Sequence, residues 1–301
     1  MTPSLVRSLL IQELAPRYGL SEAAGIARIV LEDVFQVHRK PESVFAAEWS
    51  AAQSDDLQQI IRRLVAGEPV QYFVGSADFF GLVFQVSPAV LIPRQETEEL
   101  VAWMLEYLRS IDKESPVSLL DIGLGSGCIG ITLKKKIPGI ELYGLEKSAE
   151  ALAVATTNAQ RILGDNRPFQ FFHGDILEPS DWQAFPLLDI IVSNPPYIPT
   201  AEKELMPEHV LSHEPELALF VSNEDPLVFY RTIADFALKK LRPGGVLFFE
   251  CNEFNAKEVA RLLSEKGFQD VALKKDLSGA DRMVRGRRRV NGNADDADLA
   301  D

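Results

Sequence analysis

The stretch LLDIGLGSGCIG, residues 119–130, decides the fold of this chain. It begins with apolar residues typical of a buried strand, and the glycine-rich turn at residues 123–127 leads directly into a helical pattern. Glycine is needed where a backbone turns sharply or approaches a ligand closely, because a side chain would collide there. A strand, a glycine turn and a helix in this order predict a nucleoside-cofactor site in an α/β domain.

The chain on both sides of this stretch supports that prediction. After Pro116, short apolar runs alternate with helical stretches, and the runs are VSLLDIG, IELYGLE, FQFFHGD, LLDIIVSNPP, GGVLFFECN and DVALKKD. Strands separated by helices indicate a mostly parallel sheet with helices on both faces. Ligands of such sheets bind at the carboxyl ends of the strands, so we predict a Rossmann-like α/β domain with its site at that edge.

Acidic residues close the second and third predicted strands. Glu146 could accept hydrogen bonds from ribose hydroxyls, and Asp175 with Ile176 could contact an adenine amino group and ring. Residues 125–130, GSGCIG, also satisfy the GxGxxG pattern, so a nicotinamide cofactor stays open from this segment alone. The predicted cofactor-binding residues are Asp121, Gly123, Leu124, Gly125, Ser126, Gly127, Glu146, Asp175, Ile176 and Asn194.

The fourth predicted strand runs into Asn194, Pro195, Pro196 and Tyr197, which we predict to be the catalytic residues. Consecutive prolines restrict the backbone and remove two amide donors, so the carbonyl groups there can only accept hydrogen bonds. The Asn194 side-chain oxygen and the Pro195 carbonyl could therefore hold a planar NH2 group, and Tyr197 could stack on it. An amide nitrogen is a weak nucleophile, so its preorganised placement beside an electrophile would matter.

The chain before the sheet predicts a second, smaller domain. Apolar residues recur at helical spacing through residues 4–65, which predicts a helical bundle over residues 1–68. Residues 69–93 change to aromatic and β-branched residues around two glycines, which predicts a β-hairpin linker. We assign residues 94–288 to the catalytic domain, and residues 289–301, which lack a core pattern, to a disordered tail.

Composition narrows the functional classes. With 46% hydrophobic and 25% charged residues in 301, the chain reads as an ordinary globular protein. No apolar run reaches the roughly 18 residues of a membrane span, so we expect a cytoplasmic protein without a membrane partner. The net charge of -13 argues against a nucleic-acid substrate. His213 stands without a Cys/His cluster, so we predict no metal.

Several segments together resemble the HemK-type peptide chain release factor glutamine methyltransferases. They are GEPVQYFVGSADFFGLVFQVSPAVLIPRQETEELV, DIGLGSGCIGI, SNPPYIP, HEPELAL and RPGGVLFFE, and they extend over almost the whole chain. The NPPY motif is shared with adenine DNA methyltransferases, whereas the LIPR and ETEELV segment is more specific. Leu124, Gln95 and Glu146 depart from residues common in the family.

The resemblance implies an S-adenosylmethionine-dependent methyltransferase domain with a seven-stranded sheet and an N-terminal domain that recognises the release factor. It implies that the acceptor glutamine of a Gly-Gly-Gln loop lies on residues 194–197. The substrate-binding residues that it implies are Asn194, Pro195, Pro196, Tyr197, Phe80, Pro93, Arg94 and Glu96.

Four other functions remain open from the sequence. A ribosomal protein glutamine methyltransferase would use the same pocket with a different docking surface. An adenine N6 methyltransferase would hold a flipped base on the same acceptors. A nicotinamide oxidoreductase has only GSGCIG in its favour, and a noncatalytic binding module leaves the paired donor-site and acceptor-site features unexplained.

Overall fold

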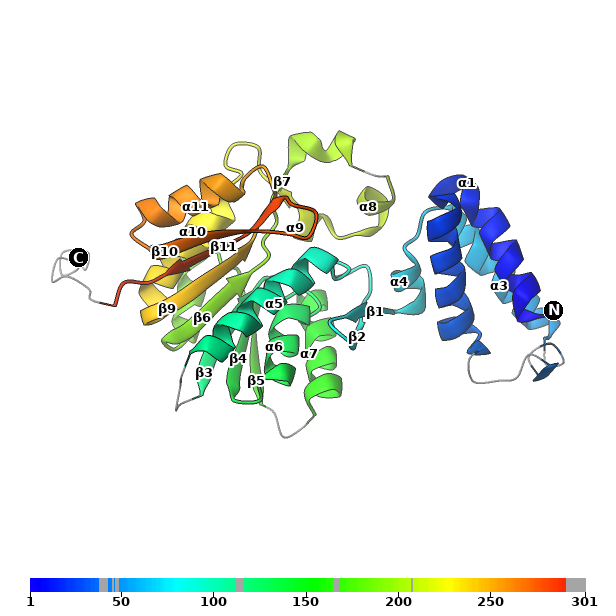
Figure 1. Cartoon of the computed structure of the whole chain (residues 1–301), viewed down its shortest axis with the longest axis horizontal. Coiled ribbons are helices and arrows are strands. Elements are labelled where there is room, and N and C mark those ends of the chain that lie inside the picture. The colour runs from blue at the N-terminus through cyan, green and yellow to red at the C-terminus, as the bar shows by residue number, and fades with distance from the viewer. Residues whose placement is uncertain are drawn as a thin grey trace. The chain divides into compact units, whose positions relative to one another are not determined.

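The computed structural model describes residues 1–37, 43, 44, 46, 49–111, 116–164, 168–206 and 208–290. The chain forms two compact units (Figure 1). The first contains residues 1–76 and 206–213, and the second contains residues 77–205 and the chain from residue 214 onward. In this division residues 77–93 group with the second unit, whereas the sequence predicts a linker over residues 69–93. Of the predicted tail, residues 291–301 lie outside the described residues.

The first unit is helical, as its apolar spacing predicted. Its elements are α1 (Pro3–Ile29), a π-helix (Val30–Val34), α3 (Ala51–Val65), α4 (Val70–Val74) and α8 (Glu208–His213). Gly19, at φ 76°, interrupts the helical backbone of α1. Ser50 starts α3 with a capping box, in which its side chain accepts from Gln53 N and the Gln53 side chain accepts from Ser50 N. Leu10, Leu14, Leu57 and Leu64 are fully buried in a core of its own.

The hairpin is shorter than the predicted linker. Val70–Val74 is a helical turn, and only β1 (Ser76–Phe79) and β2 (Leu82–Gln85) pair as strands. The two residues between the strands, Phe80 and Gly81, have φ values of 52° and 74°. A two-residue turn with positive φ at both positions matches the right-handed twist of the flanking strands, and Phe80 adopts a conformation that favours glycine or asparagine.

The second unit contains the predicted Rossmann-like sheet, with seven strands in the order β10-β11-β9-β6-β3-β4-β5. Neighbours from β9 to β5 pair in parallel, while β11 pairs antiparallel with both β9 and β10. The strands are β3 (Val117–Ile122), β4 (Ile140–Glu146), β5 (Phe169–His173), β6 (Leu188–Ser193), β9 (Leu241–Glu250), β10 (Gln269–Lys275) and β11 (Asp281–Arg287). The strand pattern of the sequence did not identify β11.

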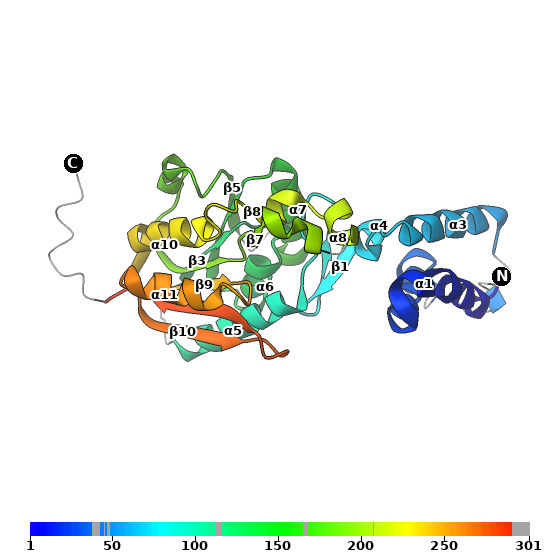
Figure 2. The ribbon, with the colours of Figure 1, turned by 90° about the horizontal axis from the view of Figure 1, so that it is seen from above.

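Helices cover both faces of the sheet. Those of one face pack into the core around Leu119 and Ile190, and those of the other pack around Leu120 and Ile191. Figure 2 shows β3 and β9 between α10 and α6. One face carries α5 (Gln95–Ser110), α6 (Cys128–Lys136) and α7 (Ala149–Leu163), and the other carries α10 (Val228–Lys240) and α11 (Ala256–Glu265).

Short elements fill the connections at the carboxyl edge of the sheet. They are 3-10 helices at Pro179–Ala184 and Thr200–Leu205, α9 (Glu216–Leu219), and the paired β7 (Ile198–Pro199) and β8 (Phe220–Val221). None of the helices in the described residues is both long enough and apolar enough to span a membrane.

Candidate active site

The glycine loop between β3 and α6 has a backbone that only glycine adopts without strain. Gly123, Gly125 and Gly127 have φ values of 72°, 54° and 79°. A Cβ atom on Gly127 would also lie 2.5 Å from Ile131 Cδ1 in the first turn of α6. The loop therefore presents its backbone without side chains at three positions.

Asp121, in β3, contacts the first turn of α6, the helix that follows this loop. Its Oδ2 accepts a hydrogen bond from Gly130 N at 2.9 Å, and a Cβ on Gly130 would lie 2.8 Å from Leu142 Cδ1. Asp121 Oδ1 has no hydrogen-bond partner in the part of the chain that the structure describes, and burial raises the pKa of Asp121 to about 8. Asp121 does not line the cavity described below, and its hydrogen bond holds the start of α6 against β3 from outside that cavity.

Glu146, at the end of β4, is held by two backbone donors. Its carboxylate accepts from Gly125 N and from Ser148 N, both at 2.8 Å. Ser148 is the N-cap of α7, where its side chain accepts from Ala151 N. The carboxylate of Glu146 therefore joins the glycine loop to the start of the next helix, and these two hydrogen bonds hold it in place.

Asp175 and Ile176 follow β5 at the same edge. Asp175 Oδ2 forms an ion pair with Lys147 Nζ at 2.8 Å, and Asp175 Oδ1 accepts from Leu177 N at 2.9 Å. Ile176 is buried and offers an apolar surface beside this carboxylate. The two residues combine an acceptor with an apolar wall, which suits a heteroaromatic ring carrying an amino group.

Asn194, Pro195 and Pro196 leave the sheet beside the glycine loop. Ile122 and Ser193 are partners in the β3–β6 register, and Ser193 Oγ donates to the Ile122 carbonyl at 2.7 Å. The two segments therefore start from neighbouring strand ends. The Asn194 side-chain nitrogen donates to Thr97 Oγ1 at 3.4 Å. Tyr197 is half-buried, packs against the core beneath α10 and has its pKa raised by burial.

The segment before α5 contributes Pro93 and Arg94. Arg94 forms an ion pair with the buried Glu214 of the HEPELAL segment. Phe80 packs instead against the core on the α5 side, where its backbone nitrogen donates to Glu98 Oε1 at 2.5 Å. Phe80 is therefore not part of the cavity wall that the resemblance implied.

A cavity of about 300 Å³ joins these segments. It brings together most of the predicted residues, namely Gly123, Leu124, Gly125, Ser126, Glu146, Asp175, Ile176, Asn194, Pro195, Pro196, Pro93 and Arg94. The predicted residues that do not line it are Asp121, Gly127, Tyr197, Phe80 and Glu96.

Sequence reasoning missed other lining residues, including Val90, Thr97, Ser148, Phe229 and Ile233. Ser148 had a usable signal, because it lies two residues after a strand end and caps a helix. Phe229 and Ile233 had none, because their spacing is the ordinary apolar spacing of a helix that packs on a sheet. No group of three or more histidine, cysteine, aspartate or glutamate side chains placed to hold a metal ion occurs within the described ranges.

Comparison with known proteins places both units in one family. Residues 103–216 match the family model described as Methyltransferase small domain, and residues 9–75 match that of the PrmC N-terminal domain. In Flavobacterium psychrophilum, a protein named release factor glutamine methyltransferase is 37% identical and aligns over 93% of this chain and 96% of its own length. One of the same name from Bacteroides thetaiotaomicron is 43% identical over 79% of this chain and 83% of its own.

Among solved structures, the hMettl16 catalytic domain in complex with a MAT2A 3'UTR hairpin has a TM-score of 0.55 at 16% identity. The match covers 71% of this chain and 77% of that one. At that identity the likeness concerns the fold alone. The relatives in Flavobacterium and Bacteroides extend through both units, and on that ground this chain belongs to the release factor glutamine methyltransferase family.

Proposed function

We propose that this protein transfers a methyl group from S-adenosylmethionine to the side-chain amide nitrogen of the glutamine in the Gly-Gly-Gln loop of peptide chain release factors. One observation carries the proposal: the glycine loop and residues 194–196 line the same cavity. A methyl donor on the loop and an amide on Asn194 would therefore lie next to each other. The names of the relatives supply the class of acceptor protein.

The donor side of the cavity has groups suited to S-adenosylmethionine. A carboxylate offers about four acceptor positions, and Glu146 uses two of them on Gly125 N and Ser148 N, which leaves acceptors for ribose hydroxyls. Asp175 and Ile176 suit the adenine amino group and ring, while the glycine positions leave room for the amino-acid part. When bound, S-adenosylmethionine supplies an electrophilic methyl group on a sulfonium sulfur.

The acceptor side has to present a weak nucleophile correctly. Asn194 Oδ1 and the Pro195 carbonyl would each accept one N–H of the glutamine amide and aim its nitrogen at the methyl carbon. As the nitrogen–carbon bond forms, the sulfur–carbon bond breaks, and one N–H proton passes to water. Both acceptors stabilise the positive charge that develops on the nitrogen, which is how preorganised dipoles lower a barrier.

The decisive assay offers labelled methyl donor with a purified release factor, ribosomal protein or DNA, and locates the label by peptide mass spectrometry. We expect label on the glutamine of the Gly-Gly-Gln loop. Label on a ribosomal protein glutamine or on adenine, with the release factor unlabelled, would replace this function with one of its rivals. The net charge of -13 disfavours the adenine reaction.

For the cofactor, we expect S-adenosylhomocysteine to raise the melting temperature and NADH to leave it unchanged, because a ligand stabilises only the state that it binds. Thermal denaturation at matched ligand concentrations measures both effects. Stabilisation by NADH alone would favour the oxidoreductase alternative.

Replacing Glu146 with alanine is expected to weaken S-adenosylhomocysteine binding about tenfold, or about 1.4 kcal/mol. The change removes the proposed ribose acceptor and also frees Gly125 N and Ser148 N. Glu146→Gln keeps one acceptor oxygen and should give an intermediate Kd by calorimetry. Unchanged affinity in the alanine variant would show that the ribose is held elsewhere.

A further inference from the structure

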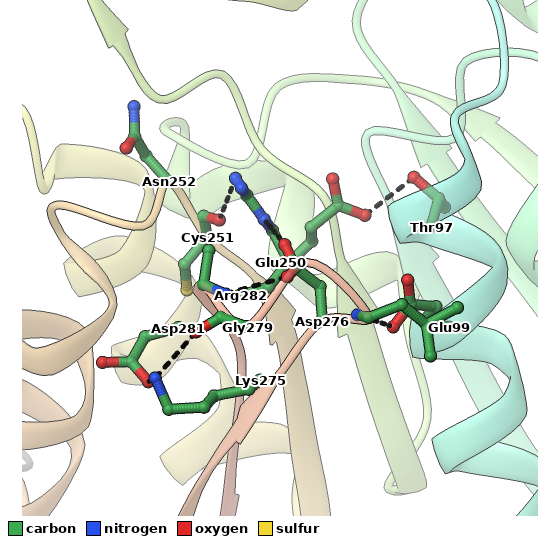
Figure 3. Close-up of polar contacts among 12 residues, drawn as sticks. Thr97, Glu99, Glu250, Cys251, Asn252, Lys275, Asp276, Gly279, Asp281 and Arg282 are labelled. Carbon is green, nitrogen blue, oxygen red and sulfur yellow. Dashed lines mark hydrogen bonds and ion pairs between the residues drawn. The ribbon is translucent and has the colours of Figure 1, made fainter.

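Three side chains from different elements meet beside the acceptor site. Thr97 lies in the first turn of α5, Glu250 is the last residue of β9, and Asn194 follows β6. Thr97 Oγ1 donates to Glu250 Oε2 at 2.7 Å, and the Asn194 side-chain nitrogen donates to Thr97 Oγ1 at 3.4 Å. Figure 3 shows the first of these contacts, between α5 and the end of β9. The hydrogen bonds thus form a chain that links Asn194 to Thr97 and Thr97 to Glu250, and a hydrogen bond from Asn194 also lowers the pKa of Glu250.

The far end of this chain is enclosed. Glu250 is 2% exposed, and Thr97, although it lines the cavity, is 3% exposed, so bulk solvent has little access to their contact. The β10–β11 hairpin carries Arg282 to the same place, where its guanidinium contacts Asp276 Oδ2 at 3.0 Å and the Cys251 carbonyl at 3.3 Å (Figure 3). A buried carboxylate without a metal or a nearby cation is costly. Arg282 forms its ion pair with Asp276, and its positive charge also lowers the pKa of Glu250.

The direction of the hydrogen bonds determines how Asn194 is turned. A hydroxyl has one proton, and Thr97 gives it to Glu250, so toward Asn194 the Thr97 oxygen can only accept. The atom of Asn194 that faces Thr97 must therefore be its NH2 group. The remaining atom, Oδ1, is left to accept a hydrogen bond from the substrate.

We propose that Glu250 and Thr97 are positioning residues, which hold the Asn194 amide with its oxygen toward the glutamine NH2 group. The proposal rests on the proposed function, because it requires a methyl-accepting NH2 group that donates two hydrogen bonds. An asparagine amide has nearly the same shape when it is turned by 180°, so shape alone does not select the orientation. Turned the wrong way, Asn194 would present hydrogens to the hydrogens of the substrate.

The protonation of Glu250 makes this orientation sensitive to pH. Burial raises the pKa of Glu250 to about 7, against the lowering effects of the Thr97 hydrogen bond, Arg282 and Asn194, and Glu96 raises it further. Tyr197, Tyr230, Cys251 and Cys128 near it have pKa values raised by burial and stay neutral. Asp276, paired with Arg282, has a lowered pKa and is ionised. Above its pKa, Glu250 can only accept, which fixes the Thr97 proton. Below it, the carboxyl gains an O–H that can donate to Thr97 and reverse the chain.

The first test removes the hydroxyl. We expect Thr97→Val to lower kcat about tenfold, which corresponds to about 1.4 kcal/mol in activation free energy. The affinity for S-adenosylhomocysteine and the KM for the release factor should change little. Thr97→Ser, which keeps the hydroxyl, should restore most of kcat. Thr132→Val is the matched control, because Thr132 is also buried in a helix and its hydroxyl has no partner among the described residues. It should leave kcat unchanged.

The second test compares the pH dependence of the wild type with that of a Glu250 variant. In the wild type, single-turnover rates with saturating donor and release factor should rise as pH increases through about 7. Glu250→Gln should make the rate independent of pH over the same range. A flat wild-type profile, or a Thr97→Val variant as fast as the wild type, would overturn the positioning role. A wild type that methylates no release factor glutamine would instead overturn the proposed function.

Discussion

Replacing Asn194 with alanine is expected to lower kcat by about 100- to 1,000-fold, the usual effect of removing one preorganised hydrogen-bonding group from an active site. The variant keeps the Pro195 carbonyl but loses the second acceptor for the glutamine NH2 group. The donor site uses the glycine loop and the Glu146 carboxylate, which this change does not touch. Rapid-quench single turnovers measure the chemical step, and calorimetry with S-adenosylhomocysteine measures donor binding.

A surface asparagine provides the control for this experiment. Asn223 Oδ1 accepts from Ala201 N at 2.8 Å on an exposed turn, so Asn223→Ala loses a similar side chain away from the cavity. It should keep the wild-type kcat. If Asn194→Ala lost donor binding and kept its turnover, Asn194 would belong to the donor site and the acceptor role would be wrong.

The parallel part of the sheet was predictable because its strands are marked locally. Every residue of β3 and β6 is buried, so these strands are nearly continuous apolar runs bounded by turn residues. The glycine loop was predictable for a related reason, since three positive φ values in one turn leave a repeated glycine as their trace. Burial and backbone conformation both act at the residue itself, and a single sequence records them.

The antiparallel edge was less predictable. β11 has the sequence DRMVRGR, in which only Met283, Val284 and Gly286 are buried and four residues are charged. This segment forms a strand because it pairs with β9 and β10, although its composition does not suggest a strand. Val70–Val74 has the opposite problem, because β-branched and aromatic residues suggest a strand while the chain forms one helical turn there. Tertiary context overrides propensity in both segments.

The candidate site also contains residues that the sequence could predict and residues that it could not. Glu146, Asp175 and Asn194 were predictable because each lies at, or within two residues after, the end of a strand at the site edge. Thr97 and Glu250 were not, although both lie in segments that carried the family resemblance. Their contact joins residues 153 positions apart, and no spacing within either segment indicates that the two side chains meet. Pairwise contacts between distant segments are what the structure adds to the sequence.

Removing residues 1–75 is expected to lower kcat/KM for an intact release factor by about 100-fold, or about 2.8 kcal/mol, while leaving the affinity for S-adenosylhomocysteine nearly unchanged. A glutamine side chain offers too little surface to distinguish one protein from another, so selectivity requires a second region of contact. The helical unit is suited to provide it, because it has its own hydrophobic core and matches a family domain over residues 9–75.

The control for this deletion is a short peptide that contains the Gly-Gly-Gln sequence, since it is too small to use a second region of contact. Both the full chain and the truncated enzyme should methylate the peptide with similar kcat/KM, provided that calorimetry shows the truncated form still binds S-adenosylhomocysteine. The stretch 206–213 groups with the helical unit but remains in the truncated chain, so this check of folding is needed. A loss for the intact factor alone assigns partner selection to the first unit. Equal values for the intact factor would mean that the catalytic unit selects its partner unaided, and the division of labour proposed for the two units would be wrong.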